Sequence, residues 1–120
     1  MKDIEILTYE GEGYRPVHDF ESWRVALLNH AERFDARTIK ELERHRETDE
    51  IFVLLCGQGE LIVGEEMHRV PMEYGKVYNI PKGIYHGISV SEDARVLIVE
   101  NADTTRENTD RIPLPRPLEG

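Results

Sequence analysis

The stretch Gly75-Lys-Val-Tyr-Asn-Ile-Pro81-Lys-Gly83-Ile-Tyr-His86 decides how this chain folds. Pro81 restricts its own backbone angle φ and Gly83 tolerates a positive φ, so the two can turn the chain sharply before His86. His86 would open the next strand and, because side chains alternate along a strand, would share a face with Ile88. We therefore expect this histidine to point into an interior.

A second stretch, Glu43-Arg-His45-Arg-Glu-Thr-Asp-Glu50-Ile-Phe-Val-Leu-Leu-Cys-Gly57, contains a continuous apolar run over residues 51–56. Such a run, between a polar segment and a glycine turn, is typical of a strand that is covered on both faces. Strand alternation places Glu50 on one face with Phe52, Leu54 and Cys56. A carboxylate on an apolar face needs a partner, and a metal ion or a histidine is suited to that role.

These two stretches resemble the two sequence motifs of the cupin superfamily. The second motif of that family reads Gly, five residues, Pro, one residue, Gly, two residues, His, and Gly75, Pro81, Gly83 and His86 occupy its positions. The first motif reads His-x-His, three or four residues, Glu, six residues, Gly. His45, Glu50 and Gly57 fit it, whereas Glu43 replaces the leading histidine. The resemblance covers roughly residues 39–100, and the short spacing between the motifs is similar to that of small single-domain bacterial cupins.

The resemblance implies an all-β, single-domain jelly roll, which is a double-stranded antiparallel β-barrel, with one short helical or irregular segment near residues 30–38. Many members of the family hold a divalent metal through the histidines and the glutamate of the two motifs. Their activities include dioxygenases, isomerases, decarboxylases, epimerases and metal-free storage or sensor domains. The fold therefore does not identify the reaction.

By the same resemblance, His45, Glu50 and His86 are candidate metal ligands, with Glu43 as a fourth candidate. Two imidazoles and one carboxylate suit a divalent transition metal such as Fe, Mn, Ni, Co or Zn, and three protein ligands leave coordination positions open. The alternative is that these residues form a hydrogen-bonded polar cluster without a metal, because one histidine of the motif is missing. No nucleotide or organic cofactor is indicated.

Two functional hypotheses follow from this ligand set. The first is a metal-dependent enzyme of isomerase or dioxygenase type, and the second is a metal-free module that binds a small ligand without catalysis. In the first, oxygen atoms of the substrate would fill the open positions of the metal. In the second, a small molecule would occupy a pocket in the barrel lined by Phe52, Leu54, Tyr78 and His86. Tyr85 and Asn79 are weaker candidates. His18, His30 and His68 show no partner spacing and are expected at the surface.

Short strands at even spacing are predicted near residues 51–56, 60–63, 67–72, 77–80, 86–90 and 94–100. Upstream of them we expect strands at 4–9, 14–17 and 23–29, a segment over 30–33 that could be helical, and an extended chain over 39–44. In this organisation, residues 1–38 form strands that pack on the barrel or on a dimer partner. Residues 39–100 form the core and residues 101–120 an extended Pro-rich tail, all within one domain.

The composition argues against nucleic acid and membranes as partners. The chain has 24 acidic and 15 basic residues and a net charge of -9, which repels phosphate backbones and anionic lipid. It has no apolar run of about 18 residues, and its first residues lack the apolar core of a signal peptide. We therefore expect a cytoplasmic protein. The acidic residues between positions 41 and 50 are expected to favour cations over anionic substrates.

The chain has a single cysteine, Cys56, which cannot form an internal disulfide and so agrees with a reducing compartment. At the end of an apolar strand, it is expected to be a buried and inert thiol. The other face of the same strand carries Ile51, Val53 and Leu55, which also need cover. A second copy of the chain could supply that cover, which predicts a homodimer.

Overall fold

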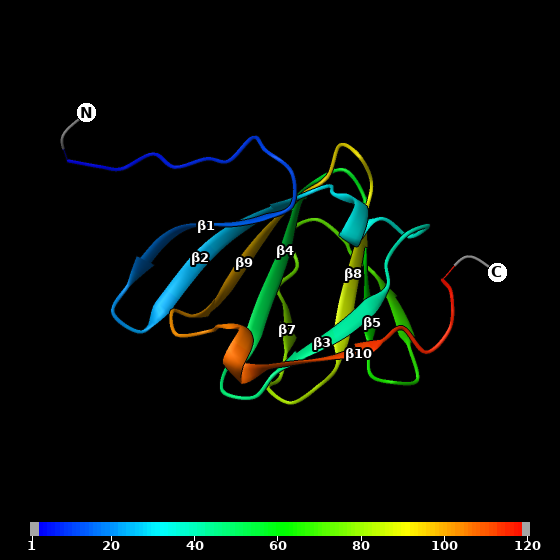
Figure 1. The fold of residues 1–120 in the computed structure, drawn as a ribbon. Coiled ribbons are helices and arrows are strands. Elements are labelled where there is room, and N and C mark those ends of the chain that lie inside the picture. The colour runs from blue at the N-terminus through cyan, green and yellow to red at the C-terminus, as the bar shows by residue number, and fades with distance from the viewer. Residues whose placement is uncertain (1–2, 119–120) are drawn as a thin grey trace.

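The computed structural model describes residues 3–118 and contains ten strands (Figure 1). They are β1 (Tyr14–Phe20), β2 (Trp23–Asn29), β3 (Glu41–His45), β4 (Glu50–Cys56), β5 (Gly59–Val63), β6 (His68–Pro71), β7 (Tyr78–Ile80), β8 (His86–Val90), β9 (Arg95–Asn101) and β10 (Thr109–Pro113). Two short 3-10 helices lie in connections between strands: η1 (Glu32–Phe34) between β2 and β3, and η2 (Arg106–Asn108) between β9 and β10. Within residues 3–118, no helix is long and apolar enough to span a bilayer.

The strands form two antiparallel five-stranded sheets that face each other. The first sheet has the order β1-β2-β9-β4-β7 and the second has the order β10-β3-β8-β5-β6. This arrangement confirms the predicted all-β jelly roll, and η1 lies in the segment that was predicted to be helical or irregular. The six strands predicted downstream of residue 50 are all present, and each of their ends differs from the prediction by at most one residue.

The three central strands of the first sheet, β2, β9 and β4, carry apolar side chains on both faces. Their pairing registers place these side chains in rows that run across the three strands. The inward rows are buried and consist of Ala26, Ile98 and Phe52, followed by Leu28, Val96 and Leu54. The outward rows consist of Val25, Val99 and Ile51, followed by Leu27, Leu97 and Val53. The inward rows meet Leu61, Ile88 and Val90 of the second sheet, and together these residues form the core of the barrel.

The C-terminal segment is more structured than the predicted extended tail. Its residues 109–113 form β10, which pairs with β3 at the edge of the second sheet. An edge strand tolerates the proline at its end, because a missing N–H there breaks no ladder. Further along, Leu114 and Leu118 pack on a second apolar cluster, formed by Leu42, Ile62 and Met67. The C-terminal segment therefore covers the outer face of the second sheet, and residues 119–120 lie outside the described part.

The predicted strand at residues 4–9 is wrong. This segment has no regular secondary structure and extends away from the barrel (Figure 1). Ile6 is 82% exposed. Only the end of the segment is fastened, because Asn29 and Arg95 donate hydrogen bonds to the carbonyl oxygen of Tyr9 at 2.9 and 2.8 Å. The alternation of side chains in this segment was not enough to make it a strand, because a strand also needs a neighbouring strand with which to form backbone hydrogen bonds.

The prediction of a buried Cys56 is also wrong. In the pairing of β4 with β9, Leu54 faces Val96 but Cys56 faces Arg95, so the register shifts at Leu55. An extra residue in one strand breaks the alternation of its side chains. Cys56 is exposed and no longer shares the face of Leu54, and its thiol lies 3.5 Å from the carbonyl oxygen of Asp93.

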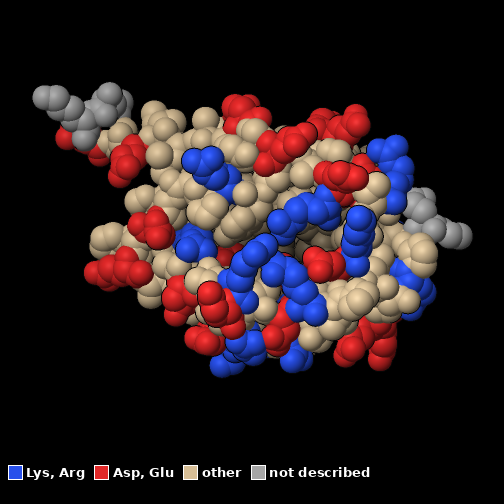
Figure 2. Space-filling view, viewed as in Figure 1, with Lys and Arg blue, Asp and Glu red and all other residues tan. Residues whose placement is uncertain are grey.

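The barrel opens at one end into a cavity of about 900 Å³, which both sheets and η1 line. Figure 2 shows a hollow on the face that is turned to the viewer, with Lys and Arg side chains around it. The candidate ligands of the two motifs lie in this cavity. The fold thus places them at the open end of the barrel.

Gly57 turns the chain between β4 and β5 and is expected to tolerate no side chain. Its φ is +73°, and a Cβ there would lie 2.5 Å from the Cα of Ala94. We expect Gly57→Ala to lower the free energy of unfolding by roughly 2 kcal/mol or more, because left-handed strain adds to a backbone clash. Urea denaturation measures this loss.

Gly75→Ala is the matched control, because Gly75 has a φ of +81° but nothing lies within 4 Å of its added Cβ. Only the strain remains there, at about 1 kcal/mol. If both variants lower the free energy of unfolding by the same amount, the clash of the added Cβ with Ala94 does not contribute at Gly57.

Candidate functional site

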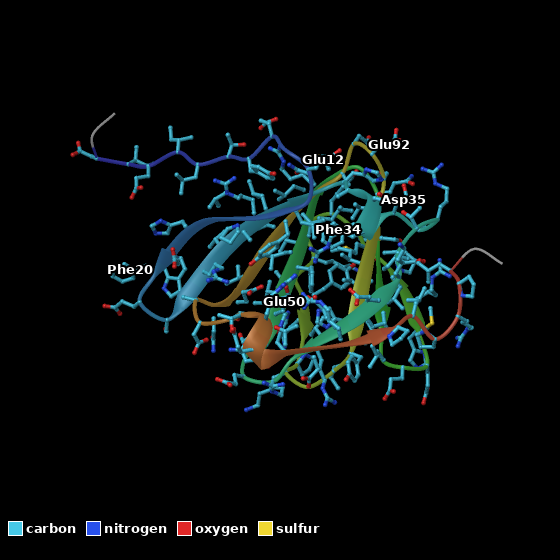
Figure 3. The ribbon with its side chains drawn as sticks, in the orientation of Figure 1. Glu12, Phe20, Phe34, Asp35, Glu50 and Glu92 are labelled. Carbon is cyan, nitrogen blue, oxygen red and sulfur yellow. The ribbon has the colours of Figure 1, made fainter. Side chains whose placement is uncertain are left out.

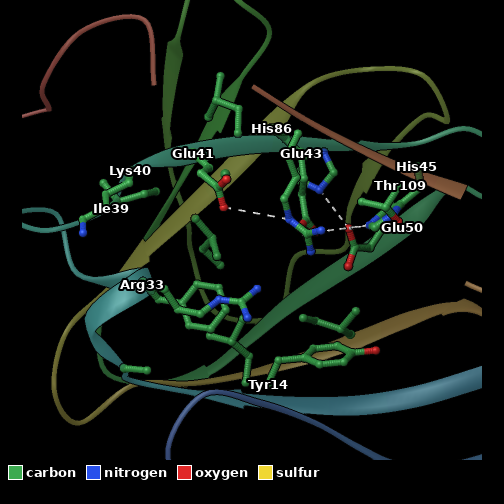
Figure 4. A pocket seen from close by; sticks show the side chains of 18 of the residues that line it. Tyr14, Arg33, Ile39, Lys40, Glu41, Glu43, His45, Glu50, His86 and Thr109 are labelled. Carbon is green, nitrogen blue, oxygen red and sulfur yellow. Dashed lines mark hydrogen bonds and ion pairs between the residues drawn. The ribbon is translucent and has the colours of Figure 1, made fainter. Parts of the chain in front are cut away.

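Glu50 opens β4 in the first sheet and is buried inside the barrel, with 4% of its surface exposed (Figure 3). His45 ends β3 and His86 opens β8, and both strands belong to the second sheet. The Nε2 atoms of His86 and His45 lie 2.8 and 3.1 Å from the same oxygen of Glu50, Oε1 (Figure 4). The side chains that the two motifs pointed to therefore meet in the space between the sheets.

The second nitrogen of each imidazole ring is also engaged. Nδ1 of His86 lies 3.0 Å from the carbonyl oxygen of Ile84, which can only accept, so Nδ1 carries a proton. In the neutral ring, Nε2 is then the atom with the free lone pair. Nδ1 of His45 lies 2.9 Å from the hydroxyl oxygen of Thr109 on β10. These outer contacts orient both rings with Nε2 toward Glu50.

Glu43, which stands where the family has its leading histidine, joins the same cluster. Its Oε2 lies 3.4 Å from Nε2 of His45, and its Oε1 lies 3.3 Å from Nη2 of Arg111. The side chain of Glu43 is 27% exposed, whereas those of Glu50 and His86 are almost fully buried. Glu43 therefore connects the buried floor of the cavity to its mouth.

The turn of the second motif is fastened to the first motif. The amide of Gly83 donates to the carbonyl oxygen of His45 at 2.7 Å. Asp49 accepts hydrogen bonds from the backbone amide of Lys82 at 2.9 Å and from the side chain of Asn79 at 3.1 Å. The turn before His86 is thus fixed by hydrogen bonds to His45 and to Asp49. Asn79 contributes to this connection as a donor to Asp49.

The charges in the cluster follow from its contacts. Burial by itself lowers the pKa of a histidine and raises that of a carboxyl. Here the contacts with Glu43 and Glu50 outweigh burial, so the pKa of His45 rises to about 10 and the pKa of His86 also rises. The two histidines in turn hold the pKa of Glu50 below its usual range, against the effect of its burial. In the absence of a metal, the cluster is therefore a set of ion pairs at neutral pH.

The donor atoms of the cluster are spaced like the ligands of a metal ion. One such atom from each of Glu43, His45, Glu50 and His86 lies within 4.8 Å of the others. Bonds of about 2.1 Å to a transition metal place neighbouring ligand atoms about 3.0 Å apart in an octahedron and about 3.4 Å apart in a tetrahedron. The contacts of 2.8, 3.1 and 3.4 Å lie near these values. The group could therefore hold a metal ion.

A further polar group on β1, β2 and β9 was not foreseen from the sequence. Glu100 is 6% exposed, and its burial together with the charge of the neighbouring Glu50 raises its pKa to about 8. Nη1 of Arg24 lies 3.6 Å from Glu100 Oε2. Nε of Arg24 and the hydroxyl of Tyr14 are buried without a hydrogen-bond partner among the described residues. The sequence does contain a signal for Glu100. It is two residues from the inward Ile98 on the same strand, just as Glu50 is two residues from the inward Phe52, so strand alternation places it on the inward face.

Of the residues predicted to line the pocket, Phe52 does so and its ring lies against His86, with centroids 5.8 Å apart. Leu54 is two residues further along β4 and belongs to the apolar core, so it does not line the cavity. Tyr78 does not line it either. Its hydroxyl accepts a hydrogen bond from the amide of Glu73 at 2.9 Å, and its ring packs on the core.

The remaining histidines lie outside the cluster. His30 has a partner that its sequence spacing did not reveal, because its Nε2 lies 2.8 Å from a carboxylate oxygen of Asp35. His18 packs on the ring of Trp23, and His68 is exposed. Within the described residues, none of the three belongs to a group that could hold a metal. Tyr85 stacks with the guanidinium of Arg44 at 4.6 Å.

Comparisons with known proteins agree with this fold. The family model described as the cupin domain matches residues 32–100. No curated protein matches the chain in sequence.

Solved structures resemble the chain at low sequence identity. Pac13 of Streptomyces, described as a nucleoside dehydratase, has a TM-score of 0.68 at 10% identity, over 92% of this chain and 88% of Pac13. An RmlC-like cupin protein from Desulfovibrio desulfuricans has a TM-score of 0.60 at 24% identity, over 84% and 96%. A cupin-2 domain protein from Shewanella frigidimarina has a TM-score of 0.61 at 20% identity, over 78% and 84%. These similarities show the fold alone.

Glu100 is expected to make the metal-free protein less stable as the pH rises. Its pKa in the folded chain is about 8, against a usual value of 4.5, so the folded state binds the extra proton between these limits. Between pH 5 and pH 8 we expect the free energy of unfolding to fall by roughly 1 to 3 kcal/mol more in the wild type than in Glu100→Gln. Urea denaturation of chelator-treated protein across this range measures the difference.

Glu92→Gln removes an exposed glutamate that does not line the cavity and serves as the control. It should follow the wild-type profile. If the free energy of unfolding depends on pH in the same way in the wild type and in Glu100→Gln, the raised pKa of Glu100 is refuted.

Proposed function

The chain belongs to the cupin domain family, and we propose that it binds a small molecule in its barrel at a divalent transition metal held by His45, Glu50 and His86. The reaction would be of the isomerase or dioxygenase type. The observation that carries the proposal is the convergence of two Nε2 atoms on one oxygen of Glu50, at 2.8 and 3.1 Å. Both rings are also held from behind through Nδ1, as is usual for histidines that bind metals.

The donor set limits the identity of the metal. Two imidazoles and a carboxylate suit Fe, Mn, Ni, Co or Zn, and Glu43 as a fourth, harder ligand would favour Mn or Fe. The metal would supply a Lewis acid for an oxygen of the substrate, or an activator of O₂ if it is iron. The protein's own contribution would be to fix the ligands, to shield them with Phe52, and to leave space for the substrate above them.

The size of the cavity supports a small-molecule ligand. Its volume of about 900 Å³ lies within the usual range for ligand pockets, about 300 to 1,000 Å³. Structures of Pac13, which has the same fold, contain uridine. That nucleoside is a precedent for a small molecule in this kind of barrel and does not name the substrate here.

A metal-free binding module is the second candidate, and one observation favours it. With Glu43 in place of the histidine, the cluster contains two carboxylates for two histidines, so its ion pairs are complete without a cation. Such a module would use the same cavity without catalysis.

Metal analysis of untagged protein separates the two candidates. We expect close to one transition-metal ion per chain, lost in His86→Ala because a ligand with a fixed ring orientation is removed. The control is His68→Ala, which removes an exposed histidine outside the cluster and should retain the metal. If the protein shows no affinity for added Mn, Fe, Co, Ni or Zn, the metal site is excluded and the metal-free binding module is the remaining candidate.

We also propose that the chain forms a homodimer through the outer face of the first sheet. The outward rows of β2, β9 and β4 are apolar throughout, as described above. Trp23 and Leu55, on the same strands, are 43% and 49% exposed. A second copy that covers this face would remove those side chains from water. The single, exposed Cys56 fits a reducing cytoplasm, which is the location we propose.

Light scattering during size-exclusion chromatography tests the dimer. We expect a mass of twice the 13.9 kDa of one chain for the wild type. Val53→Lys should shift the protein to the monomer, because it places a charge within the outward row. Val77→Lys changes a valine outside this row that is 65% exposed, and it should leave the dimer intact. A monomeric wild type would overturn the proposal.

A further inference from the structure

Basic side chains gather at the cavity although the whole chain has a net charge of -9. Five of its fifteen Lys and Arg residues line the cavity, namely Arg24, Arg33, Lys40, Arg106 and Arg111. All of them except Arg24 are exposed, and they come from segments far apart in the sequence. Figure 2 shows Lys and Arg side chains around the hollow. Six glutamates line the same cavity, so its preference for a ligand depends on which of these charges have partners within the protein.

Arg33 has free hydrogen-bonding capacity in this group. It extends from η1 toward the centre of the cavity (Figure 4), and its guanidinium carbon lies 4.6 Å from the centroid of the Phe34 ring. Stacking on a ring face leaves the N–H groups at the edge of the guanidinium plane available. Within residues 3–118, no carboxylate lies within ion-pair distance of Arg33. Its donors are therefore available to a ligand.

The nearest buried carboxylate along the chain is fully engaged elsewhere. Asp35 is 8% exposed and lies 2.8 Å from Nε2 of His30. It also accepts hydrogen bonds from the backbone amide and the guanidinium of Arg37, at 2.9 to 3.0 Å. These contacts fasten the segment around η1, which packs against β8. Arg33 is thus presented from a held segment and is not neutralised by it.

The acidic residues of the cavity floor have partners of their own. Glu50 pairs with the two histidines, and Arg111 lies 3.3 Å from Glu43 and 3.9 Å from Glu41. Asp49 is bound to the turn before His86 and does not line the cavity. The three acidic residues of this run that line the cavity, Glu41, Glu43 and Glu50, therefore each lie beside a basic side chain. Two exposed glutamates, Glu12 and Glu32, remain at the border.

We propose that the cavity binds a small anionic ligand whose carboxylate or phosphate group is held by Arg33, while another oxygen of the same molecule reaches the floor formed by His45, Glu50 and His86. The role of the floor rests on the function proposed above, whereas the anion site at Arg33 does not require the metal. A planar guanidinium donates two parallel hydrogen bonds to the oxygens of a carboxylate or phosphate. Lys40 and Arg106 add positive charge beside it.

Two matched pairs of probes test this proposal. Glutarate is compared with glutaramide, and glycerol 3-phosphate is compared with glycerol. The members of a pair differ in the anionic group, and the two pairs separate a carboxylate from a phosphate. Calorimetric titration of the whole chain, with and without prior chelator treatment, measures each affinity. We expect the anion of at least one pair to bind at least about tenfold more tightly than its neutral partner.

The matched variants are Arg33→Gln and Arg15→Gln. Arg15 is also exposed and also stacks on an aromatic ring, that of Tyr9 at 5.5 Å, but it does not line the cavity. Both variants remove one positive charge and so change the net charge of the chain equally. We expect Arg33→Gln to weaken binding of the anion at least about tenfold and Arg15→Gln to change it by less than about twofold.

The proposal is overturned by any of three results: equal binding of charged and neutral probes, no binding of either anion at millimolar concentration, or equal effects of the two variants. The metal analysis gives an independent answer. Anion binding that depends on Arg33 in a protein with no affinity for metals would overturn the metal site alone. A metal-loaded protein without a preference for anions would overturn this inference alone.

Discussion

The rest of the structure depends on one buried carboxylate that joins the two sheets. Glu50 stands on the first sheet, and one of its oxygens is shared by histidines from two strands of the second sheet. A carboxylate with 4% exposure has lost its hydration, and charge-assisted hydrogen bonds or a cation must offset that loss. The positions of β3, β4 and β8 are therefore coupled, because a shift of any one of them would leave a buried charge without its partner.

The contacts around this carboxylate extend outward in layers. Thr109 and the carbonyl oxygen of Ile84 orient the two imidazoles, and the amide of Gly83 ties the turn before His86 to His45. A group held in this way keeps its geometry whether protons or a cation occupy its centre. Toward the mouth the chemistry changes, since Arg33 there carries donors that no carboxylate of the described chain engages. One cavity thus combines a floor able to hold a cation with a mouth suited to an anion.

Much of the fold could be predicted, because most of its strands are marked by local alternation between turn residues. The run over residues 51–56 became β4, and the segment from Trp23 to Asn29 became β2. The failures have a common cause. Residues 4–9 alternate like a strand but lack a neighbour, and Cys56 leaves the inward face because β4 shifts its register against β9. Both outcomes depend on the pairing partner, which the alternation of a single segment does not contain.

The sequence by itself determined that His86 and Glu50 point inward, because a turn and an apolar run set the phase of each strand within a few residues. It also identified His45 by the spacing of the first motif. Only the tertiary structure decided what surrounds them. Thr109 is 64 residues from His45, and Glu100 reaches Glu50 through the pairing of β9 with β4. Arg33 and Arg111 approach the same cavity from opposite ends of the chain. Contacts over such separations depend on the order and register of whole sheets, which packing across the barrel selects and no local pattern records.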